Sequence, residues 1–505
     1  MKTMNKKGIR IPHTLVLIYL VVIFCSIMTY FIPVGVFDVE QKTYVQNGEE
    51  VTRTVLKPET FRIVKDENGN SIKYNAPLFG TEDFGGKTGA LNAVFEGMVS
   101  GDKWGPAVGV IAFVLVIGGA FAIVMRTGAI DNGLNTIISI SNGKEYLIIP
   151  LVYTMFSLGG ATFGMNEEVI PFVMILAPMT VAMGYDSVTA LMITIVASEV
   201  GFATSWMNPF GVALAQSIAD IPVLSGAGFR MVMWLFFTIM GVIFTMNYAR
   251  KIKKNPSLSV SYESDDHFRN ISGNIEIKSK LGIGDKLVLL TVVLTVIWVV
   301  YGVVAYSYYI PEIASQFFVM GLISGIIGVI FKLNNMEIDD IATSFQKGAA
   351  DLLGAALVIA IARGILIVLG GVDANTPSVL NTILSKAGNL ISVFPPAISA
   401  WFMFIFQSIF NFFIISGSGQ AALTMPLMAP LSDIAGVTRQ VGVLAYQLGD
   451  GFTNLIFPTA GVLIACLSAA RLDYIKWAKF QIKYQALLFL SGSIFIFAAV
   501  LIGLN

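Results

Sequence analysis

The stretch Gly201-Phe202-Ala203-Thr204-Ser205-Trp206-Met207-Asn208-Pro209-Phe210-Gly211-Val212-Ala213-Leu214-Ala215 decides the fold, because a related stretch occurs later in the chain. The later copy reads Gly451-Phe452-Thr453-Asn454-Leu455-Ile456-Phe457-Pro458-Thr459-Ala460-Gly461-Val462-Leu463-Ile464-Ala465, with Gly-Phe, Gly-Val and the final Ala in register. The same alignment places 163–168 opposite 415–420. Two similar halves with Gly, Pro and Asn inside apolar segments are typical of secondary transporters built from repeats.

Composition indicates a polytopic membrane protein. Of the 505 residues, 55% are hydrophobic and 13% are charged, whereas soluble domains average about 25% charged residues. The mean hydropathy is +0.75. The formal net charge is zero, so nothing favours nucleic acid as a partner.

The chain offers few residues for metal, cofactor or enzyme chemistry. Cys25 and Cys466 both lie in apolar segments and are expected to be small buried side chains. His13 and His267 are far apart in the sequence. We therefore expect no metal site, no cofactor and no catalytic centre. A channel remains an alternative class, and the absence of a nucleotide-binding loop argues against ATP-driven pumping.

A crossing needs about 20 apolar residues, and the apolar segments predict about nine transmembrane helices in an all-α protein. The predicted order is a first span at 1–33, an extracytoplasmic loop with an interfacial helix at 34–106, repeat 1 at 107–250, a cytoplasmic linker at 251–286, connecting and scaffold spans at 287–332, and repeat 2 at 333–505. Basic residues flank the predicted inner ends of the spans. This distribution places the N-terminus in the cytoplasm and the C-terminus outside.

Each repeat contains one looped-back pair of short apolar segments and one interrupted span. We expect an inner re-entrant hairpin at 147–184 and an outer one at 395–435. The broken helices are expected at 188–217 and 441–467. Two full crossings in place of the first hairpin would give the same orientation, but its tip would then be an ordinary outer loop. The extra span at 287–306 makes the two repeats antiparallel, as an inverted pair requires.

The breaks predict a binding site at mid-membrane. Asn208-Pro209 combines a cap with a proline at the first helical position, and Pro458-Thr459 is expected to start the second half-helix. Helix N-termini bind carboxylates and phosphates. The alternative is that these prolines only kink packed helices.

Acidic and polar residues occur at the same places and are the candidate substrate-binding residues. Charged groups at membrane depth are costly and are often functional. The acidic candidates are Glu167, Glu168, Glu199 and Asp450. The uncharged candidates are Asn166, Ser205, Asn208, Ser416, Ser418, Gln420, Thr453, Asn454 and Thr459. Alternatively, the tip glutamates lie at a wet surface, and Arg363 forms a structural pair with one of the acids.

These groups constrain the solute. Helix N-termini favour a carboxylate, whereas the acids favour a cation. Two like charges about 4 Å apart repel by about 4 kcal/mol at an effective dielectric constant near 20. A small amino acid with one carboxylate and an additional ammonium or guanidinium group satisfies both requirements.

Four motifs resemble the YfcC-like branch of the anaerobic C4-dicarboxylate carrier family, which also contains basic amino acid antiporters. The motifs are Gly164–Glu168, Asn208-Pro209-Phe210, Ser416–Pro426 and Gly449–Asn454. The resemblance implies the ion transporter superfamily fold, with a scaffold domain, a transport domain with two opposed hairpins, a homodimer and elevator-type movement. Relatives often carry Ser-Asn-Thr at each hairpin tip, and this chain does not.

The sequence therefore predicts a secondary transporter of the bacterial inner membrane that exchanges or takes up basic amino acids of the arginine/ornithine type. The alternative is a proton- or sodium-coupled C4-dicarboxylate carrier. Expected partners are the small-molecule substrate, membrane lipid, a coupling proton or sodium ion, and a second copy of the chain.

Overall fold

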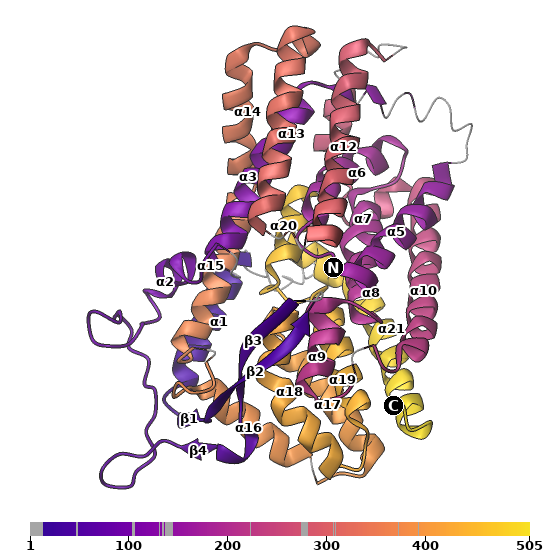
Figure 1. The fold of residues 1–505 in the computed structure, drawn as a ribbon. Coiled ribbons are helices and arrows are strands. Elements are labelled where there is room, and N and C mark those ends of the chain that lie inside the picture. Colours follow the sequence, from indigo (N-terminus) through magenta and orange to yellow (C-terminus); the bar gives the residue numbers. More distant parts are fainter. Residues whose placement is uncertain are drawn as a thin grey trace, which may run out of the picture.

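The computed structural model describes residues 14–46, 49–103, 107–130, 132–133, 136, 145–222, 224–273, 281–306, 308, 310–371, 373–391 and 393–505. These residues are mostly helical, as predicted (Figure 1). The basic N-terminal start lies outside the described residues. The sequence also predicts one amphipathic arm at 129–140 and a second at 377–390. Most of the first lies outside the described residues, and the second is present as α16 (Val379–Ile391).

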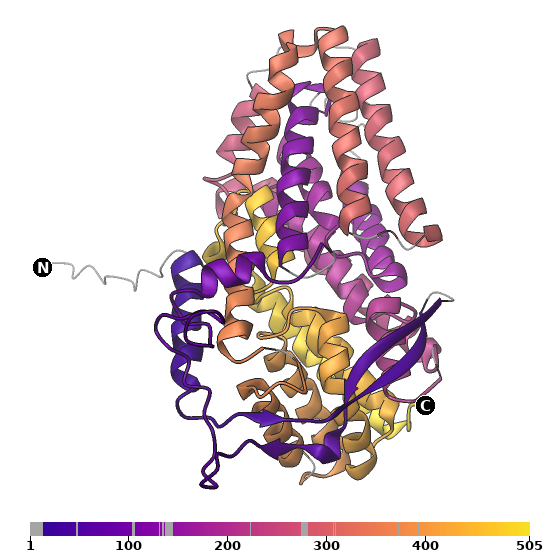
Figure 2. The same cartoon turned by 60° about the vertical axis from the view of Figure 1, so that its left-hand side comes forward.

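The N-terminal region has one apolar helix followed by short strands. Its elements are α1 (Thr14–Met28), β1 (Gly35–Val36), β2 (Val39–Gln46), β3 (Glu49–Leu56), the 3-10 helix η1 (Pro58–Thr60), β4 (Arg62–Ile63) and α2 (Ala93–Val99). The Val- and Thr-rich stretches of this region predict a small β-hairpin, and β2 pairs antiparallel with β3. Figure 2 shows this ribbon extending across the lower half of the molecule, and it contacts α9 and α18.

One group of helices packs around α3 (Val108–Arg126). Its other long members are α12 (Ile283–Tyr306), α13 (Ile310–Ile330), α14 (Ile338–Asp351) and α15 (Leu353–Val368). Helices α13 and α14 both pack on α3, and α15 packs on α1 and α2. We call this set the α3 group.

Helix α14 is not expected from the sequence. It directly precedes α15, and the two helices are bent by 42° where they meet. Helix α14 begins with a capping box. The side chain of Glu337 accepts from the backbone N–H of Asp340, and the side chain of Asp340 accepts from the backbone N–H of Glu337. This polar start hid the helix, because its hydropathy is too low for a predicted span.

A second group contains both predicted hairpins and both broken helices; we call it the hairpin group. Its first-repeat elements are the 3-10 helix η2 (Glu145–Leu147), α5 (Ile148–Phe163), α6 (Val169–Ala182), α7 (Ser187–Leu191), the π-helical turn η3 (Met192–Val196), α8 (Ala197–Ala203), the π-helical turn η4 (Pro209–Ala213), α9 (Leu214–Ile218) and α10 (Ala227–Lys254). Its second-repeat elements are α17 (Pro396–Phe410), α18 (Gly417–Ile434), α19 (Arg439–Thr453), α20 (Gly461–Ala469) and α21 (Tyr474–Leu501). The order of two short helices followed by a broken helix thus occurs twice.

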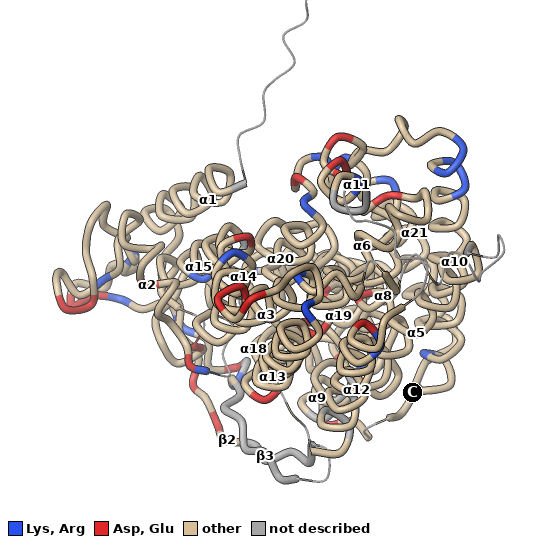
Figure 3. Tube along the Cα trace, turned by 90° about the horizontal axis from the view of Figure 1, so that it is seen from above, with Lys and Arg blue, Asp and Glu red and all other residues tan. Residues whose placement is uncertain are grey.

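The remaining short elements connect these groups. They are the 3-10 helices η5 (Pro256–Leu258) and η6 (Leu333–Asn335) and helix α11 (Asp266–Gly273). Figure 3, seen from above, shows Lys and Arg gathered beside α11.

Helices α5 and α8 cross at very short distance, and this crossing positions the first predicted hairpin. A Cβ atom at Gly201 would lie 1.9 Å from the carbonyl oxygen of Ser157, and one at Gly160 would lie 2.0 Å from that of Ser198. Only glycine fits at either position. The first tip is therefore fixed against the helix that carries Glu199.

Four described helices are long and apolar enough to cross a membrane, or five if α14 and α15 form one bent span. The four are α3, α10, α13 and α21. Helices α5, α6 and α17 are apolar but shorter, as expected for hairpin arms. The number of nine crossings, the inversion of the second repeat and the re-entrant course of the hairpins stay predictions.

Candidate functional site

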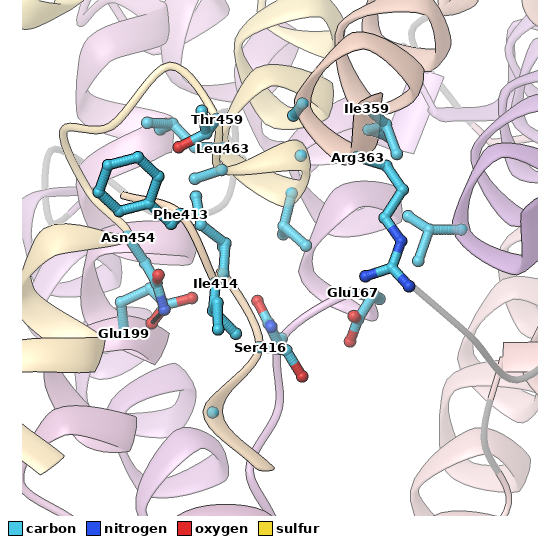
Figure 4. A pocket seen from close by; sticks show the side chains of 18 of the residues that line it. Glu167, Glu199, Ile359, Arg363, Phe413, Ile414, Ser416, Asn454, Thr459 and Leu463 are labelled. Carbon is cyan, nitrogen blue, oxygen red and sulfur yellow. Dashed lines mark hydrogen bonds between the residues drawn. The ribbon is translucent and has the colours of Figure 1, made fainter. Parts of the chain in front are cut away.

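A cavity lies where the α3 group meets the hairpin group (Figure 4). Helix α15 contributes Ile359, Ala362, Arg363 and Leu366, and α3 contributes Val110. The opposite wall comes from both hairpin tips, α8 and the second break. Its volume of about 110 Å³ is several times the roughly 10–15 Å³ that one water molecule needs, so a small polar solute fits.

The two predicted tips meet at this cavity. Asn166 and Glu167 of the first tip and Ser416 and Gly417 of the second all line it. The tips are therefore not on opposite surfaces of the protein, which was the arrangement that would have excluded a shared site.

Three ionisable side chains line the cavity. The two acidic ones lie on one wall, and the basic one lies on the opposite wall. Glu167 and Glu199 come from the hairpin group, whereas Arg363 comes from α15. In Figure 4 the guanidinium group of Arg363 points toward Glu167. Glu199 is only 2% exposed. The lining thus offers two carboxylates and one cation.

Glu199 is connected to the second repeat through two asparagines. Asn454 donates from Nδ2 to Oε2 of Glu199 at 3.2 Å, and Asn411 donates from Nδ2 to Oδ1 of Asn454 at 2.7 Å. Asn411 also donates to the hydroxyl of Thr453 at 2.9 Å and to the backbone carbonyl of Asp450 at 3.0 Å. Asn411 thus ties the second tip to the break of α19.

The first tip is a tight turn closed by Glu168. Gly164 ends α5 with φ 77°, a left-handed conformation that favours glycine. The Oε2 atom of Glu168 accepts from the backbone N–H of Asn166 at 2.9 Å. Glu168 is buried and does not line the cavity, so it shapes the tip that presents Glu167.

The first break is present where it was predicted. Asn208 caps the half-helix that follows, because its Oδ1 accepts from the N–H groups of Phe210 at 2.8 Å and Gly211 at 3.3 Å. The hydroxyl of Ser205 donates to the carbonyl of Ala161 at 2.8 Å and accepts from the N–H of Asn208 at 2.8 Å. Both side chains hold the break together, and neither lines the cavity.

The second tip is stabilised by glutamines. The Nε2 atom of Gln420 donates to Oε1 of Gln407 at 2.6 Å, and Nε2 of Gln407 donates to the hydroxyl of Thr424 at 3.0 Å. Gln407 therefore joins α17 to α18. Ser416 caps α18 by accepting from the N–H of Gly419 at 3.3 Å, and Ser418 is half-buried outside the cavity.

In the second broken helix, the half-helix after the break starts later than predicted. The half-helix α20 begins at Gly461 rather than at Pro458-Thr459, and no side chain caps it. The hydroxyl of Thr459 instead donates to the carbonyl of Phe412 at 3.0 Å. Pro458 therefore lies in the turn before α20, and Thr459 is hydrogen-bonded to the segment that follows α17.

Asp450 lies just behind the cavity. It is fully buried, and neither carboxylate oxygen has a hydrogen-bond partner among the described residues. A Cβ atom at Gly417, which lines the cavity, would lie 3.1 Å from its Oδ2. Only the small glycine separates this carboxylate from the lining.

Only some of the predicted substrate-binding residues line the cavity. The predicted residues that line it are Asn166, Glu167, Glu199, Ser416, Asn454 and Thr459. Those that do not are Glu168, Ser205, Asn208, Ser418, Gln420, Asp450 and Thr453. The role of the lining residues in substrate binding stays a prediction.

Sequence reasoning missed the apolar and cationic parts of the lining. Phe202 and Phe413 form an aromatic portion of the wall, and Arg363 lines the cavity rather than forming an ion pair with an acid of the described chain. A lone arginine deep in an apolar span was the available signal. No group of metal-ligating side chains that could hold an ion occurs among the described residues.

Comparison with known proteins gives relatives that match almost the whole chain. This protein is 49% identical over 492 residues to a protein of Escherichia coli (strain K12) named "Putative basic amino acid antiporter YfcC", and the match covers 97% of each chain. It is 28% identical over 516 residues to a protein of Haemophilus influenzae, covering 98% of each.

Two solved structures are also similar over nearly their full length. The YdaH transporter of Alcanivorax borkumensis is 14% identical with a TM-score of 0.39, covering 97% of this chain and 99% of that one. MtrF of Neisseria gonorrhoeae, described among antimetabolite efflux pumps, is 15% identical with a TM-score of 0.40, covering 98% and 96%. These TM-scores mean that the folds superpose only loosely.

The family comparison covers nearly every residue. The model of the C4-dicarboxylate anaerobic carrier family (DcuC) matches residues 11–501. Together with the 49% identity to YfcC, this match shows that the chain belongs to the C4-dicarboxylate anaerobic carrier family.

Proposed function

We propose that this protein is a secondary active transporter that exchanges or takes up basic amino acids of the arginine/ornithine type. The observation that carries the proposal is the charge of the cavity, where two carboxylates, Glu167 and Glu199, accompany a single cation, Arg363. A solute with one negative and two positive groups complements this lining. The printed name of YfcC agrees with this substrate class.

The second candidate is a C4-dicarboxylate carrier, which the family description favours. A dianion in this cavity would meet Arg363 with one carboxylate but would bring the other close to Glu167 or Glu199. Like charges about 4 Å apart repel by about 4 kcal/mol at an effective dielectric constant near 20. The glutamate next to that carboxylate would have to be protonated, whereas an ionised glutamate attracts a basic amino acid, so the amino acid is the better fit.

The position of the cavity supports an elevator-type mechanism as part of the proposal. In it, the hairpin group moves as a transport domain against the α3 group, which acts as the scaffold. The cavity is suited to this because its walls come from both groups. The transporter would act in the bacterial inner membrane as a homodimer, coupled to exchange or to a proton or sodium gradient.

Counterflow in proteoliposomes tests the function. Vesicles containing the purified protein are loaded with unlabelled arginine, and the uptake of external labelled arginine, ornithine, lysine and succinate is measured with and without proton or sodium gradients. We expect saturable uptake of the basic amino acids. Succinate uptake without arginine uptake would refute the proposal, and non-saturable flux would indicate a channel.

A further inference from the structure

We propose that Arg363 binds the carboxylate of the transported solute and thereby selects amino acids over amines that lack a carboxylate. The inference rests on the proposed function and adds a specificity-determining residue to it. It replaces the structural ion pair that sequence reasoning assigned to this arginine.

Arg363 is available for a ligand. It lies in the middle of α15, lines the cavity and extends its guanidinium group into it (Figure 4). Its Nε is buried and has no hydrogen-bond partner, and no carboxylate forms an ion pair with Arg363 within 4.0 Å, among the residues that the structure describes. A half-buried guanidinium group that has no ion-pair partner in the described part of the chain favours a bound anion at this place.

A second group of donors faces the same part of the cavity. Helix α20 begins at Gly461 without a side-chain cap, and the N–H groups of Gly461, Val462 and Leu463 have no acceptor among the described residues. All three residues line the cavity. The absence of a side chain at Gly461 brings this helix end against Ile359 of α15, since a Cβ there would lie 2.6 Å from Ile359 Cγ1.

Arg363 lies one helical turn after Ile359 on α15, so the uncapped end of α20 and the guanidinium group belong to one neighbourhood. Guanidinium matches a carboxylate with two parallel N–H···O bonds, and a helix N-terminus adds N–H donors and a favourable dipole. These two features together form a carboxylate subsite.

The acids complete the selection. Glu167 and Glu199 belong to the hairpin group, opposite α15. A basic amino acid bound by its carboxylate at Arg363 would direct its ammonium or guanidinium groups toward them. Such a solute joins the two helix groups, whereas an amine without a carboxylate would engage only the hairpin group.

The test compares arginine with agmatine, which is the same molecule without the carboxylate. Inhibition constants of both against labelled arginine counterflow are measured for the wild-type transporter, Arg363→Gln, Arg363→Lys and the control Arg62→Gln. Arg62 is an exposed arginine of the N-terminal loop that pairs with Asp38. Size-exclusion profiles and thermal unfolding in detergent identify any variant that fails to fold, and Arg363→Lys retains the charge if Arg363→Gln fails.

We expect the wild type to prefer arginine, and Arg363→Gln to weaken arginine about 10- to 100-fold while agmatine changes little. Arg363→Lys should retain part of the preference, and Arg62→Gln all of it. Equal weakening of both compounds, or no change in either, would overturn the inference.

Failure of the proposed function gives a different result. If the wild type exchanges succinate and not arginine, basic amino acid transport is refuted, and the same variants are then assayed with succinate. Loss of succinate exchange in Arg363→Gln but not in Arg62→Gln would still support a carboxylate subsite. Unchanged succinate exchange would refute it.

Discussion

The Nδ2 atom of Asn454 donates a hydrogen bond of 3.2 Å to Oε2 of Glu199, although the two residues are 255 positions apart. Glu199 precedes the break in the first repeat, and Asn454 begins the break in the second. The bond therefore joins the interrupted segments of both repeats at the lining of one cavity.

Glu199→Gln should reduce the exchange of basic amino acids by at least about 10-fold, because a hydrogen bond to a charged group contributes about 1.5–3 kcal/mol. The glutamine retains the size of the side chain and an acceptor for Asn454, so the unfolding temperature should change little. Arginine counterflow and thermal unfolding in detergent measure the two effects.

The matched control for this variant is Glu263→Gln, which removes a carboxylate from an exposed pair with Lys476. Exposed pairs contribute about 0–1 kcal/mol, so transport should be retained. If Glu199→Gln exchanges arginine as fast as Glu263→Gln does, Glu199 does not bind the cationic end of the solute.

Asn411→Asp should destabilise the protein more than Asn411→Ala does. The amide of Asn411 donates toward three oxygens, on Asp450, Thr453 and Asn454. A carboxylate has no proton to donate to them, and a buried group without a partner costs about 1–3 kcal/mol or more if it is charged. Thermal unfolding in detergent measures the order of the two variants.

Asn68→Ala is the control for Asn411, because Asn68 lies exposed in the N-terminal loop. It should unfold at the wild-type temperature. An Asn411→Asp variant as stable as this control would show that the second tip and the break of α19 are not held together through Asn411.

The sequence was sufficient to predict the places where the chain is interrupted but not what fills the space between them. Asn208-Pro209 predicts a cap and a helix start from local chemistry alone, and Asn208 caps the half-helix as expected. The second half-helix begins three residues after Pro458, although proline favours the first helical turn, and Thr459 instead donates to the carbonyl of Phe412.

Side-chain direction was the part that local patterns could not supply. Glu167 and Glu168 are neighbours with the same chemistry, yet only Glu167 lines the cavity, while Glu168 turns back to the N–H of Asn166. That difference depends on the left-handed turn at Gly164. Similarly, the exposure of Arg363 to the cavity depends on how α15 packs against the opposite group of helices.

Gly201→Ala should destabilise the protein, because its new Cβ would lie 1.9 Å from the carbonyl oxygen of Ser157. The obstacle is backbone, so α5 and α8 must separate, and overpacking of this kind typically costs about 1–3 kcal/mol. Transport should fall as well, since the separation moves the first tip away from Glu199. The unfolding temperature and arginine counterflow measure both.

Gly228→Ala provides the comparison, since Gly228 is the second residue of α10 and a Cβ there meets nothing within 4 Å. Alanine is the better helix former, so this variant should be at least as stable as the wild type. Equal stability of Gly201→Ala and Gly228→Ala would contradict the close crossing of α5 and α8.

Thiol labelling should show that the cavity is open to a solute and binds arginine. Cys25 and Cys466 are 1% and 0% exposed, so the folded wild-type protein should react slowly with a polar maleimide. Ile415→Cys places a thiol in the lining and should react faster, and millimolar arginine should slow that reaction because the bound solute occupies the same space. Leu78→Cys, at an exposed loop position, should react whether or not arginine is present. Protection of Ile415→Cys by succinate and not by arginine would instead support the dicarboxylate carrier, because the occupant of the cavity would then be the dianion.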